Sequence, residues 1–223
     1  MNQKKIEKIL KKNNYEFIHT NTTTSTMFDV QNFIKIYNKN CIYLSDEQTQ
    51  GRGQRGNFWY SPVGNIHCSI SFFNFLDIKK HFLFSVLVSV SIKMTLERFN
   101  ANNIYFKWPN DIFYKKKKFS GIISDIMNID ENKSYLIVGF GINLISAPKI
   151  KNYQTTYIKS FCKIKSKDEF LLIFFKILFN NLNDLQKGKK NRLMEVFSDS
   201  LMLINKKIKI VLPNASTKIG VFR

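Results

Sequence analysis

Residues 47–65, EQTQGRGQRGNFWYSPVGN, decide the fold and lie between two runs with strand-like composition. Three closely spaced glycines mark the first half of this stretch: Gly51, Gly53 and Gly56. Glycine permits positive φ angles and lets backbone N–H groups approach a ligand closely. Arg52 and Arg55 add fixed positive charge beside the glycines. The stretch therefore predicts a loop that binds an anion such as phosphate or carboxylate, the alternative being a flexible surface turn.

The composition indicates one globular unit with an unusual charge. The chain has 223 residues, of which 44% are hydrophobic, and its 35 Lys+Arg against 16 Asp+Glu give a formal net charge of +19. Such a charge usually indicates a nucleic acid or an anionic membrane as partner. The lysines are spread along the chain beside abundant Asn, Ile and Phe, and no zinc finger, basic zipper or RNA-binding signature is present. We therefore attribute the charge to biased composition and expect no specific DNA partner.

The cysteines and the apolar stretches bear on the compartment. Cys41, Cys68 and Cys162 are far apart and form no CxxC pair, which indicates buried thiols in a reducing compartment. The three histidines lack metal-ligand spacing. The longest apolar stretches, 82–92 and 170–179, are too short to span a bilayer, and the N-terminus has no apolar signal region. We therefore expect a cytoplasmic protein with no membrane partner.

Hydrophobic periodicity predicts an alternation of helices and strands. Helices are expected over residues 4–12, from 26 to 37, over 79–99, after a capping box at 166–169 and over 193–203. Strands are expected over residues 15–19, 41–44, 66–72, 104–107, 112–114, 119–127, 135–140, 206–212 and 218–223.

Two of these elements carry polar groups whose position matters. Alternation in 66–72 predicts a half-buried strand with His67 on its polar face, and we give His67 no catalytic role. Ser25 or Thr26 can cap the following helix. The same hydroxyl pair could instead donate to a ligand at the helix N-terminus, but capping alone is preferred.

Further glycines mark close approach of backbone or ligand inside strands. Gly121 interrupts the strand 119–127, and GFGIN at 139–143 ends another strand. In WPND at 108–111, the proline ends regular structure and Asn-Asp favours a turn. The four lysines at 115–118 are typical of a solvated turn.

These motifs together resemble one family. Gln48, GRGQRGNFWYSPVGN, KWPND, FSGII and GFGIN follow one another in the order found in the biotin protein ligases, also called biotin–[acetyl-CoA-carboxylase] ligases. The resemblance covers about residues 20–145. It implies the class II synthetase-like biotin/lipoate ligase fold, an α+β fold whose mixed, mainly antiparallel central sheet is flanked by helices.

The resemblance also implies a domain arrangement. We expect a catalytic domain over 1–204 and, over 205–223, the truncated start of an SH3-like, β-barrel-like domain. The ligase-like strand begins near residue 15, which leaves no room for an N-terminal DNA-binding domain, so a monofunctional enzyme is expected.

The implied reaction has two steps. Biotin and MgATP give biotinyl-AMP and pyrophosphate, and a lysine of a biotin carboxyl carrier protein of acetyl-CoA or a related carboxylase then attacks the mixed anhydride. The substrates and cofactors are thus biotin, ATP and Mg²⁺, and a homodimer is compatible with the resemblance.

Individual residues take roles by their position in the family motifs. Those implied to bind biotin are Ser25, Thr26, Gln48, Gly51, Arg52, Gly53, Gln54, Lys107, Gly121 and Gly141. Those implied to bind ATP or the adenylate are Arg52, Arg55, Trp59, Lys118 and Asn143. Trp59 is expected to close over the adenylate and Asn143 to face the adenine. Asp111 is a candidate Mg²⁺ ligand, the alternative being a turn residue.

Electrostatics selects the catalytic cations among these residues. A carboxylate and an α-phosphate must meet, and their repulsion has to be neutralised where water is excluded. Arg52 and Lys107 are the expected catalytic residues. Lys107 stands at a strand end, where an ammonium on a buried stem could contact both anions.

The sequence departs from the family pattern at three places. Gln54 stands where a second arginine is usual, Met27 replaces a common asparagine, and the C-terminal segment is short. Three alternatives stay open: a lipoate or octanoate ligase, a basic nucleic-acid-binding protein, and a ligase that keeps the fold but has lost efficient turnover.

Overall fold

One large sheet organises the computed structural model, which describes residues 2–73, 81–151, 153–211 and 216–222. The sheet order is β1-β2-β3-β7-β6-β5-β4. These strands are β1 (Glu16–Thr23), β2 (Cys41–Gln48), β3 (Ile66–Phe73), β4 (Ile104–Lys107), β5 (Asp111–Tyr114), β6 (Lys117–Asn128) and β7 (Ser134–Ile142). The β1–β2 pair is parallel and the other pairs are antiparallel, so the expected mixed, mainly antiparallel sheet with flanking helices is confirmed.

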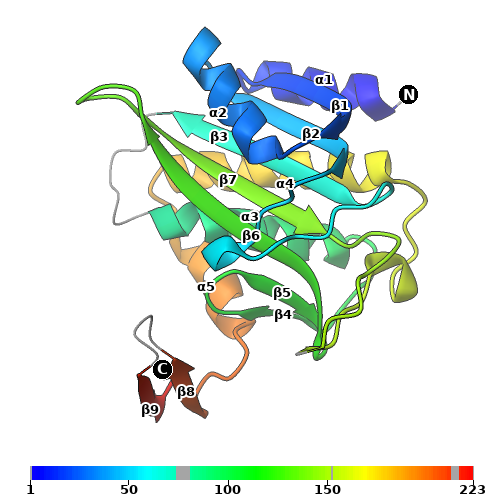
Figure 1. The fold of residues 1–223 in the computed structure, drawn as a ribbon, viewed down its shortest axis with the longest axis vertical. Helices are drawn as coiled ribbons and strands as arrows, with labels where there is room; N and C mark the ends of the chain where they lie inside the picture. The colour runs from blue at the N-terminus through cyan, green and yellow to red at the C-terminus, as the bar shows by residue number, and fades with distance from the viewer. Residues whose placement is uncertain (1, 74–80, 152, 212–215, 223) are drawn as a thin grey trace.

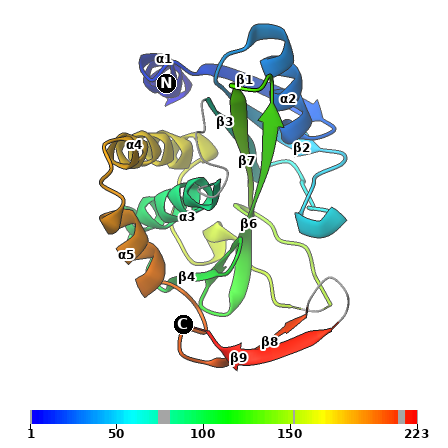
Figure 2. The ribbon, with the colours of Figure 1, turned by 90° about the vertical axis from the view of Figure 1, so that its left-hand side faces the viewer.

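The helices cover the two faces of the sheet unequally. They are α1 (Asn2–Lys12), α2 (Thr26–Tyr37), α3 (His81–Glu97), α4 (Lys167–Gln186) and α5 (Asn191–Asp199), with short 3-10 turns at Gln54–Gly56 and Ile158–Ser160. Figure 2 shows α1, α3, α4 and α5 on one side of the sheet, and α2 with the loop after β2 on the other. Residues 79, 80, 212 and 223, to which the predicted elements extend, lie outside the described residues.

Strand β3 is buried on both faces, and the half-buried strand expected for 66–72 is wrong. Cys68, Ile70 and Phe72 point into the apolar core under α3 and α4, where Phe170, Phe174 and Phe175 lie. His67, Ser69 and Ser71 point the other way and are also buried. The strand lies in the middle of the sheet with α2 packed on its second face, so polar alternation here does not mean exposure to water.

The helix ends follow capping chemistry in one case and not in another. Ser166 Oγ accepts a hydrogen bond from the backbone N–H of Glu169 at 3.1 Å, as the capping box predicts. Ser25 occupies the N-cap position of α2, but its side chain makes no capping bond, so the preferred capping role is wrong. The last helix ends at Asp199, shorter than the expected 193–203.

Within the described part of the chain, the C-terminal strands β8 (Lys207–Val211) and β9 (Thr217–Val221) pair with each other and with no strand of the main sheet. Figure 1 shows this two-stranded sheet apart from the main sheet, beyond α5. All three cysteines are buried free thiols, as expected. Among the described residues, no helix combines the length and apolarity needed to cross a bilayer.

Candidate active site

One row of register partners crosses the sheet on the face away from α3 and α4. Starting at the edge, Lys107 pairs with Asp111, Asp111 with Gly121, Gly121 with Gly141, and Gly141 with His67. Directly paired residues project to the same face of a sheet. The two glycines in the middle of the row therefore leave a groove between the side chains on either side of it.

The indole of Trp59 lies in this groove. A Cβ added to Gly141 would stand 2.1 Å from Trp59 Nε1, and one added to Gly121 would stand 3.0 Å from Trp59 Cζ3. No larger residue fits at position 141 while the indole stays in place. The resemblance implied that Trp59 closes over an adenylate, and here the indole packs directly on the strands that were expected to line the biotin pocket.

Lys118 and Asp111 form an ion pair beside the indole. Their Nζ and Oδ1 atoms are 2.7 Å apart, and Nζ lies 5.4 Å from the ring centroids of both Trp59 and Tyr153. A cation within about 6 Å of an aromatic face is attracted by the ring quadrupole. The ammonium is thus held by one carboxylate and two rings.

A chain of hydrogen bonds connects the start of α2 to the base of the loop. Gln48 Oε1 accepts from Thr26 N at 2.9 Å and from Thr26 Oγ1 at 3.1 Å. Gln48 Nε2 donates to Ser61 Oγ at 2.9 Å, and Ser61 Oγ donates to the carbonyl oxygen of Trp59 at 3.1 Å. Ser69 Oγ lies 2.8 Å from Thr26 Oγ1. The orientation of the Gln48 amide is fixed by these bonds.

The predicted loop cations sit at the outer part of the groove. Arg52 Nη1 lies 3.3 Å from Asp125 Oδ2, and its guanidinium carbon lies 5.2 Å from the centroid of the Phe28 ring. Arg55 is exposed and has a φ of 56°. Gln54 brings no charge, so Arg52 is the loop cation that is tied to the sheet.

The glycines of this loop serve different purposes from those expected. Only Gly56, at φ 75°, has a positive φ among the three. A Cβ at Gly51 would lie 2.3 Å from the carbonyl oxygen of Trp59, and one at Gly53 would lie 3.1 Å from that of Asn57. Gly51 is therefore required for space inside a tight hairpin-like turn, Gly53 fits where a side chain would be crowded, and neither is needed for a left-handed backbone.

Lys107 stands at the free edge of the row. Its side chain is exposed, so the expected buried stem is wrong, and its ammonium lies 5.9 Å from the Phe113 ring centroid. Exposure follows from the place of β4 at the edge of the sheet, where alternate side chains face solvent.

The groove opens into a cavity of about 620 Å³. All predicted site residues contribute to its lining except Gly51 and Asn143. Asn143 is buried next to it, where its Nδ2 donates to the Thr156 carbonyl oxygen at 3.2 Å and its Oδ1 has no hydrogen-bond partner among the described residues. The cavity therefore gathers residues from β2, β4, β5, β6, β7 and the loop.

Sequence reasoning did not select several residues that line the same cavity: Met27, Ser69, Trp108, Gly139, Ile150 and Tyr153. Met27 is one of the noted departures, and its sulfur would lie 2.7 Å from a Cβ at Gly139. The alternation of β3 could have singled out Ser69, had the covered second face been known. Tyr153 lies in a loop without a motif and gave no signal.

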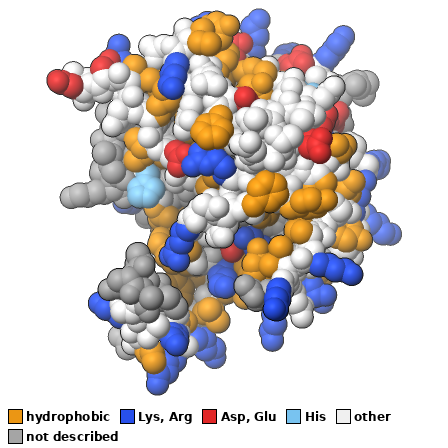
Figure 3. Space-filling view, in the orientation of Figure 1, with side chains coloured by type: hydrophobic (Ala, Val, Ile, Leu, Met, Phe, Trp, Pro, Cys, Tyr) orange, Lys and Arg blue, Asp and Glu red, His pale blue; other side chains and the backbone are white. Residues whose placement is uncertain are grey.

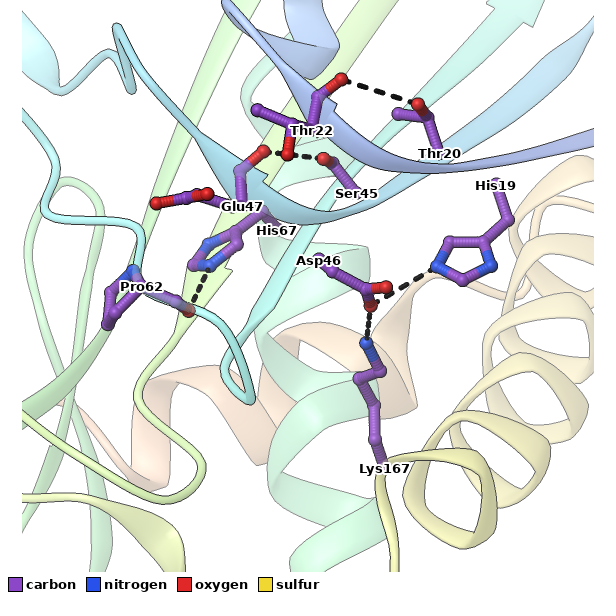
Figure 4. A network of polar contacts seen from close by, with 9 residues as sticks. All are labelled: His19, Thr20, Thr22, Ser45, Asp46, Glu47, Pro62, His67 and Lys167. Atoms are coloured by element: carbon purple, nitrogen blue, oxygen red, sulfur yellow. Dashed lines mark hydrogen bonds and ion pairs between the residues drawn. The ribbon is translucent and has the colours of Figure 1, made fainter.

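His67 is buried on the groove side of β3 and not on a solvated face as expected. Its Nε2 lies 3.2 Å from the Pro62 carbonyl oxygen, as Figure 4 shows, and its Nδ1 has no partner among the described residues. Burial lowers the pKa of His67 to about 4, while the Pro62 bond opposes this shift. The ring is therefore neutral near pH 7.

A second polar group in Figure 4 is structural. Asp46 accepts from Lys167 and lies 3.2 Å from His19 Nε2, which ties β2 to the start of α4 and to β1. Burial raises the pKa of Asp46, but the hydrogen bonds and charges of Lys167 and His19 together lower it by more than burial raises it. The pKa of Asp46 is therefore below its ordinary value. No group of three or more His, Cys, Asp or Glu able to hold a metal ion occurs in the described ranges.

The basic side chains are dispersed on one face of the molecule. Lys and Arg side chains are scattered over the face seen in Figure 3 and do not gather into one patch on it.

The fold defines the class of protein. The biotin protein ligase from Aquifex aeolicus, solved in complex with biotin and ATP, superposes with a TM-score of 0.75 over 92% of this chain and 85% of that one, at 23% identity. The biotin protein ligase of Leishmania major, in complex with biotin, gives 0.69 over 92% and 94%. The chain therefore has the biotin protein ligase fold.

The family follows from the sequence. The profile of the biotin/lipoate A/B protein ligase family matches residues 17–143, and the chain belongs to that family. The bifunctional ligase/repressor BirA of Escherichia coli is 26% identical over 102 residues, which are 45% of this chain and 32% of BirA. The human biotin–protein ligase is 29% identical over 139 residues, 59% of this chain and 19% of that protein. The matches thus span about a third or less of these two relatives.

Proposed function

We propose that the chain is an ATP-dependent biotin protein ligase that forms biotinyl-5′-AMP and transfers the biotinyl group to a lysine of a biotin carboxyl carrier protein. One observation carries the proposal. A single cavity joins the fixed amide of Gln48 to the cations Lys107, Arg52 and Lys118. Such a cavity suits an acid with a polar head and a carboxylate, together with a nucleotide. The relatives named biotin–protein ligase support this choice of acid.

The first step needs charge neutralisation. A biotin carboxylate oxygen attacks the α-phosphorus of ATP, the bond to the β-phosphate oxygen breaks, and pyrophosphate leaves. Lys107 and Arg52 reduce the repulsion between the two anions as they approach. Closure of the loop over the groove excludes water from the mixed anhydride.

The head of the acid meets the Thr26 and Gln48 end of the cavity. The oxygen of the Gln48 amide is taken by Thr26, and one hydrogen of Nε2 is taken by Ser61. One N–H of Nε2 is left to donate, since a primary amide has two donor hydrogens. This end therefore presents a donor to the ureido oxygen of biotin.

The nucleotide occupies the other end. Asn143 Oδ1, buried and without a partner among the described residues, can accept from the adenine amino group. Lys118 can exchange its contact with Asp111 for a phosphate oxygen. Asp111 is one carboxylate already paired with an ammonium, so these residues do not by themselves build a magnesium site. Mg²⁺ enters as part of the MgATP substrate.

In the second step the carrier lysine attacks the anhydride carbonyl and AMP leaves. We propose that residues 205–223, which include β8 and β9, begin a second domain next to the 1–204 catalytic domain. The homodimer remains a prediction.

Isotope exchange between ATP and pyrophosphate tests the proposal. Exchange should require biotin and MgATP, and biotin should then appear on a carrier domain added to the reaction. Lipoate or octanoate in place of biotin gives the matched comparison within the family. Exchange with lipoate but not biotin would move the assignment to the lipoate branch, and no exchange with any of these acids would remove it.

A further inference from the structure

Two buried side-chain atoms without hydrogen-bond partners belong to residues on either side of one register pair, Gly141 and His67. They are Trp59 Nε1 and His67 Nδ1, and neither has a partner among the described residues. Trp59 Nε1 stands 2.1 Å from the point where a Cβ of Gly141 would be. Gly141 is the direct register partner of His67, and the Cβ positions of such partners are about 4.5–5.5 Å apart on one face. The indole nitrogen therefore lies on the same face of the sheet as His67, at the glycine that is paired with it on the neighbouring strand.

The two atoms are complementary as donor and acceptor. An indole nitrogen can only donate. His67 Nε2 faces the Pro62 carbonyl oxygen at 3.2 Å, and a carbonyl can only accept, so Nε2 carries the proton. Burial keeps the pKa of the ring near 4, and Nδ1 of the neutral ring is then an acceptor. Each atom lacks what the other supplies.

We propose that His67 is a positioning residue for the loop tryptophan, and that Trp59 Nε1–H donates a hydrogen bond to His67 Nδ1 when the loop closes on a ligand. To form the bond the indole would move along the two glycines toward β3. The bond would fix the indole in one orientation over the bound nucleotide. The effect on turnover rests on the proposed adenylation, whereas the bond itself rests only on the binding of biotin and MgATP.

Two substitutions distinguish this role from one in which His67 only supports the loop through its hydrogen bond to the Pro62 carbonyl oxygen. Asn at position 67 keeps an acceptor close to the place of Nδ1 but cannot reach the Pro62 carbonyl oxygen. Gln at position 67 can reach that oxygen with its amide N–H but has no acceptor at the place of Nδ1. If His67 positions Trp59, His67→Asn should retain more of the native behaviour than His67→Gln. If His67 only holds the Pro62 carbonyl oxygen, His67→Gln should retain more.

Fluorescence reports on Trp59 independently of activity. The chain has two tryptophans, so a Trp108→Phe background leaves Trp59 as the only indole. With biotin and MgATP present, the background and His67→Asn should show a blue-shifted emission that acrylamide quenches weakly. His67→Gln should show a red-shifted, readily quenched emission. In the exchange assay KM for ATP should rise about fivefold to tenfold in His67→Gln, the size of one net hydrogen bond, and change less in His67→Asn.

A second variant covers the case in which a His67 substitution fails to fold. Trp59→Phe, made in the otherwise native chain, keeps an aromatic ring but removes the N–H. It should raise KM for ATP as His67→Gln does, and the double variant should show no further rise, because both remove the same bond. Additive effects in this cycle would overturn the proposal.

The remaining outcomes are also decisive. If the emission shift is lost in His67→Asn and retained in His67→Gln, His67 acts only by holding the Pro62 carbonyl oxygen. Equal emission of the two variants would exclude the bond between Trp59 Nε1–H and His67 Nδ1. Absence of exchange activity in a native chain that still binds biotin and MgATP would remove the proposed function, while the fluorescence ranking would still test the bond.

Discussion

The two faces of strand β3 are equally buried but differ in what they contact. On one face Cys68, Ile70 and Phe72 pack into a core of aromatic side chains from α3 and α4. On the other, His67 is paired with Gly141, one of the two glycines that leave a groove, and its Nδ1 has no partner among the described residues. Native interiors rarely leave such atoms unsatisfied. The difference teaches that burial alone does not identify a core, whereas missing side chains and unpaired polar atoms mark a binding face.

The largest effect should come from the packed face. Phe174→Ala removes a fully buried ring from the core and should lower the free energy of unfolding by about 3–5 kcal/mol. Urea denaturation measures this change. Lys176→Ala, an exposed position of the same helix, is the control and should change little. A loss below about 1 kcal/mol for Phe174→Ala would contradict the contrast between the faces.

The edge of the groove should show the opposite behaviour. Lys107→Ala should reduce kcat of biotin-dependent exchange by about 10²–10³, as removal of an oxyanion-type donor does. Its stability should stay within about 0.5 kcal/mol, because the side chain is exposed. Lys35→Ala, on the exposed side of α2, is the matched charge control. Equal activity of the two variants would exclude Lys107 from the reaction.

Acid should lower the free energy of unfolding through the buried His67 on the groove face of β3. Burial lowers the pKa of His67 to about 4, with Lys167 lowering it and Pro62 and Asp46 raising it. The unfolded ring, with a pKa near 6.5, binds a proton first, so stability falls as pH drops from about 6.5 to 4, by about 3 kcal/mol.

The control for this prediction removes the titrating group. Unfolding of the native chain and of His67→Gln should be compared at several pH values between 4 and 7. The native chain should lose more stability than the variant over this range. Parallel plots of stability against pH for the two proteins would show that burial does not lower the pKa of His67 in the folded state.

The smallest effect is expected at the outer end of the groove. Asp125→Asn breaks the ion pair with Arg52, which is partly exposed, and should cost about 0.2–1 kcal/mol of stability. Added salt should reduce this difference. A double-mutant cycle with Arg52→Gln measures the coupling free energy of the Arg52–Asp125 ion pair. A coupling above about 2 kcal/mol would mean that the outer end of the groove is as rigid as the core.

Local sequence signals predicted the elements well where the cause is local. The strand 104–107 and the capping box at Ser166 are confirmed because alternation and capping act within a few residues. Motif order placed Thr26, Gln48 and Lys107 around one cavity. The resemblance, and not periodicity, carried that result.

The environments that the sequence did not predict depend on contacts between residues that are distant in the chain. His67 was assigned to a solvated face because its own strand alternates, yet its environment depends on β7 and α2, which are distant in sequence. The seat of Trp59 on Gly121 and Gly141 depends on the register of β6 and β7. Tyr153 reaches Lys118 from a loop that has no periodic pattern.

The fixed amide of Gln48 has a consequence for how the loop can move. Its bond to Ser61, the bond from Ser61 to the Trp59 carbonyl and the 2.8 Å bond from Trp59 N to Gly51 O fasten both ends of the loop. These bonds hold residues 51 and 59 together at the base of the loop. Backbone that is already held by such bonds has less conformational entropy left to lose when a ligand binds.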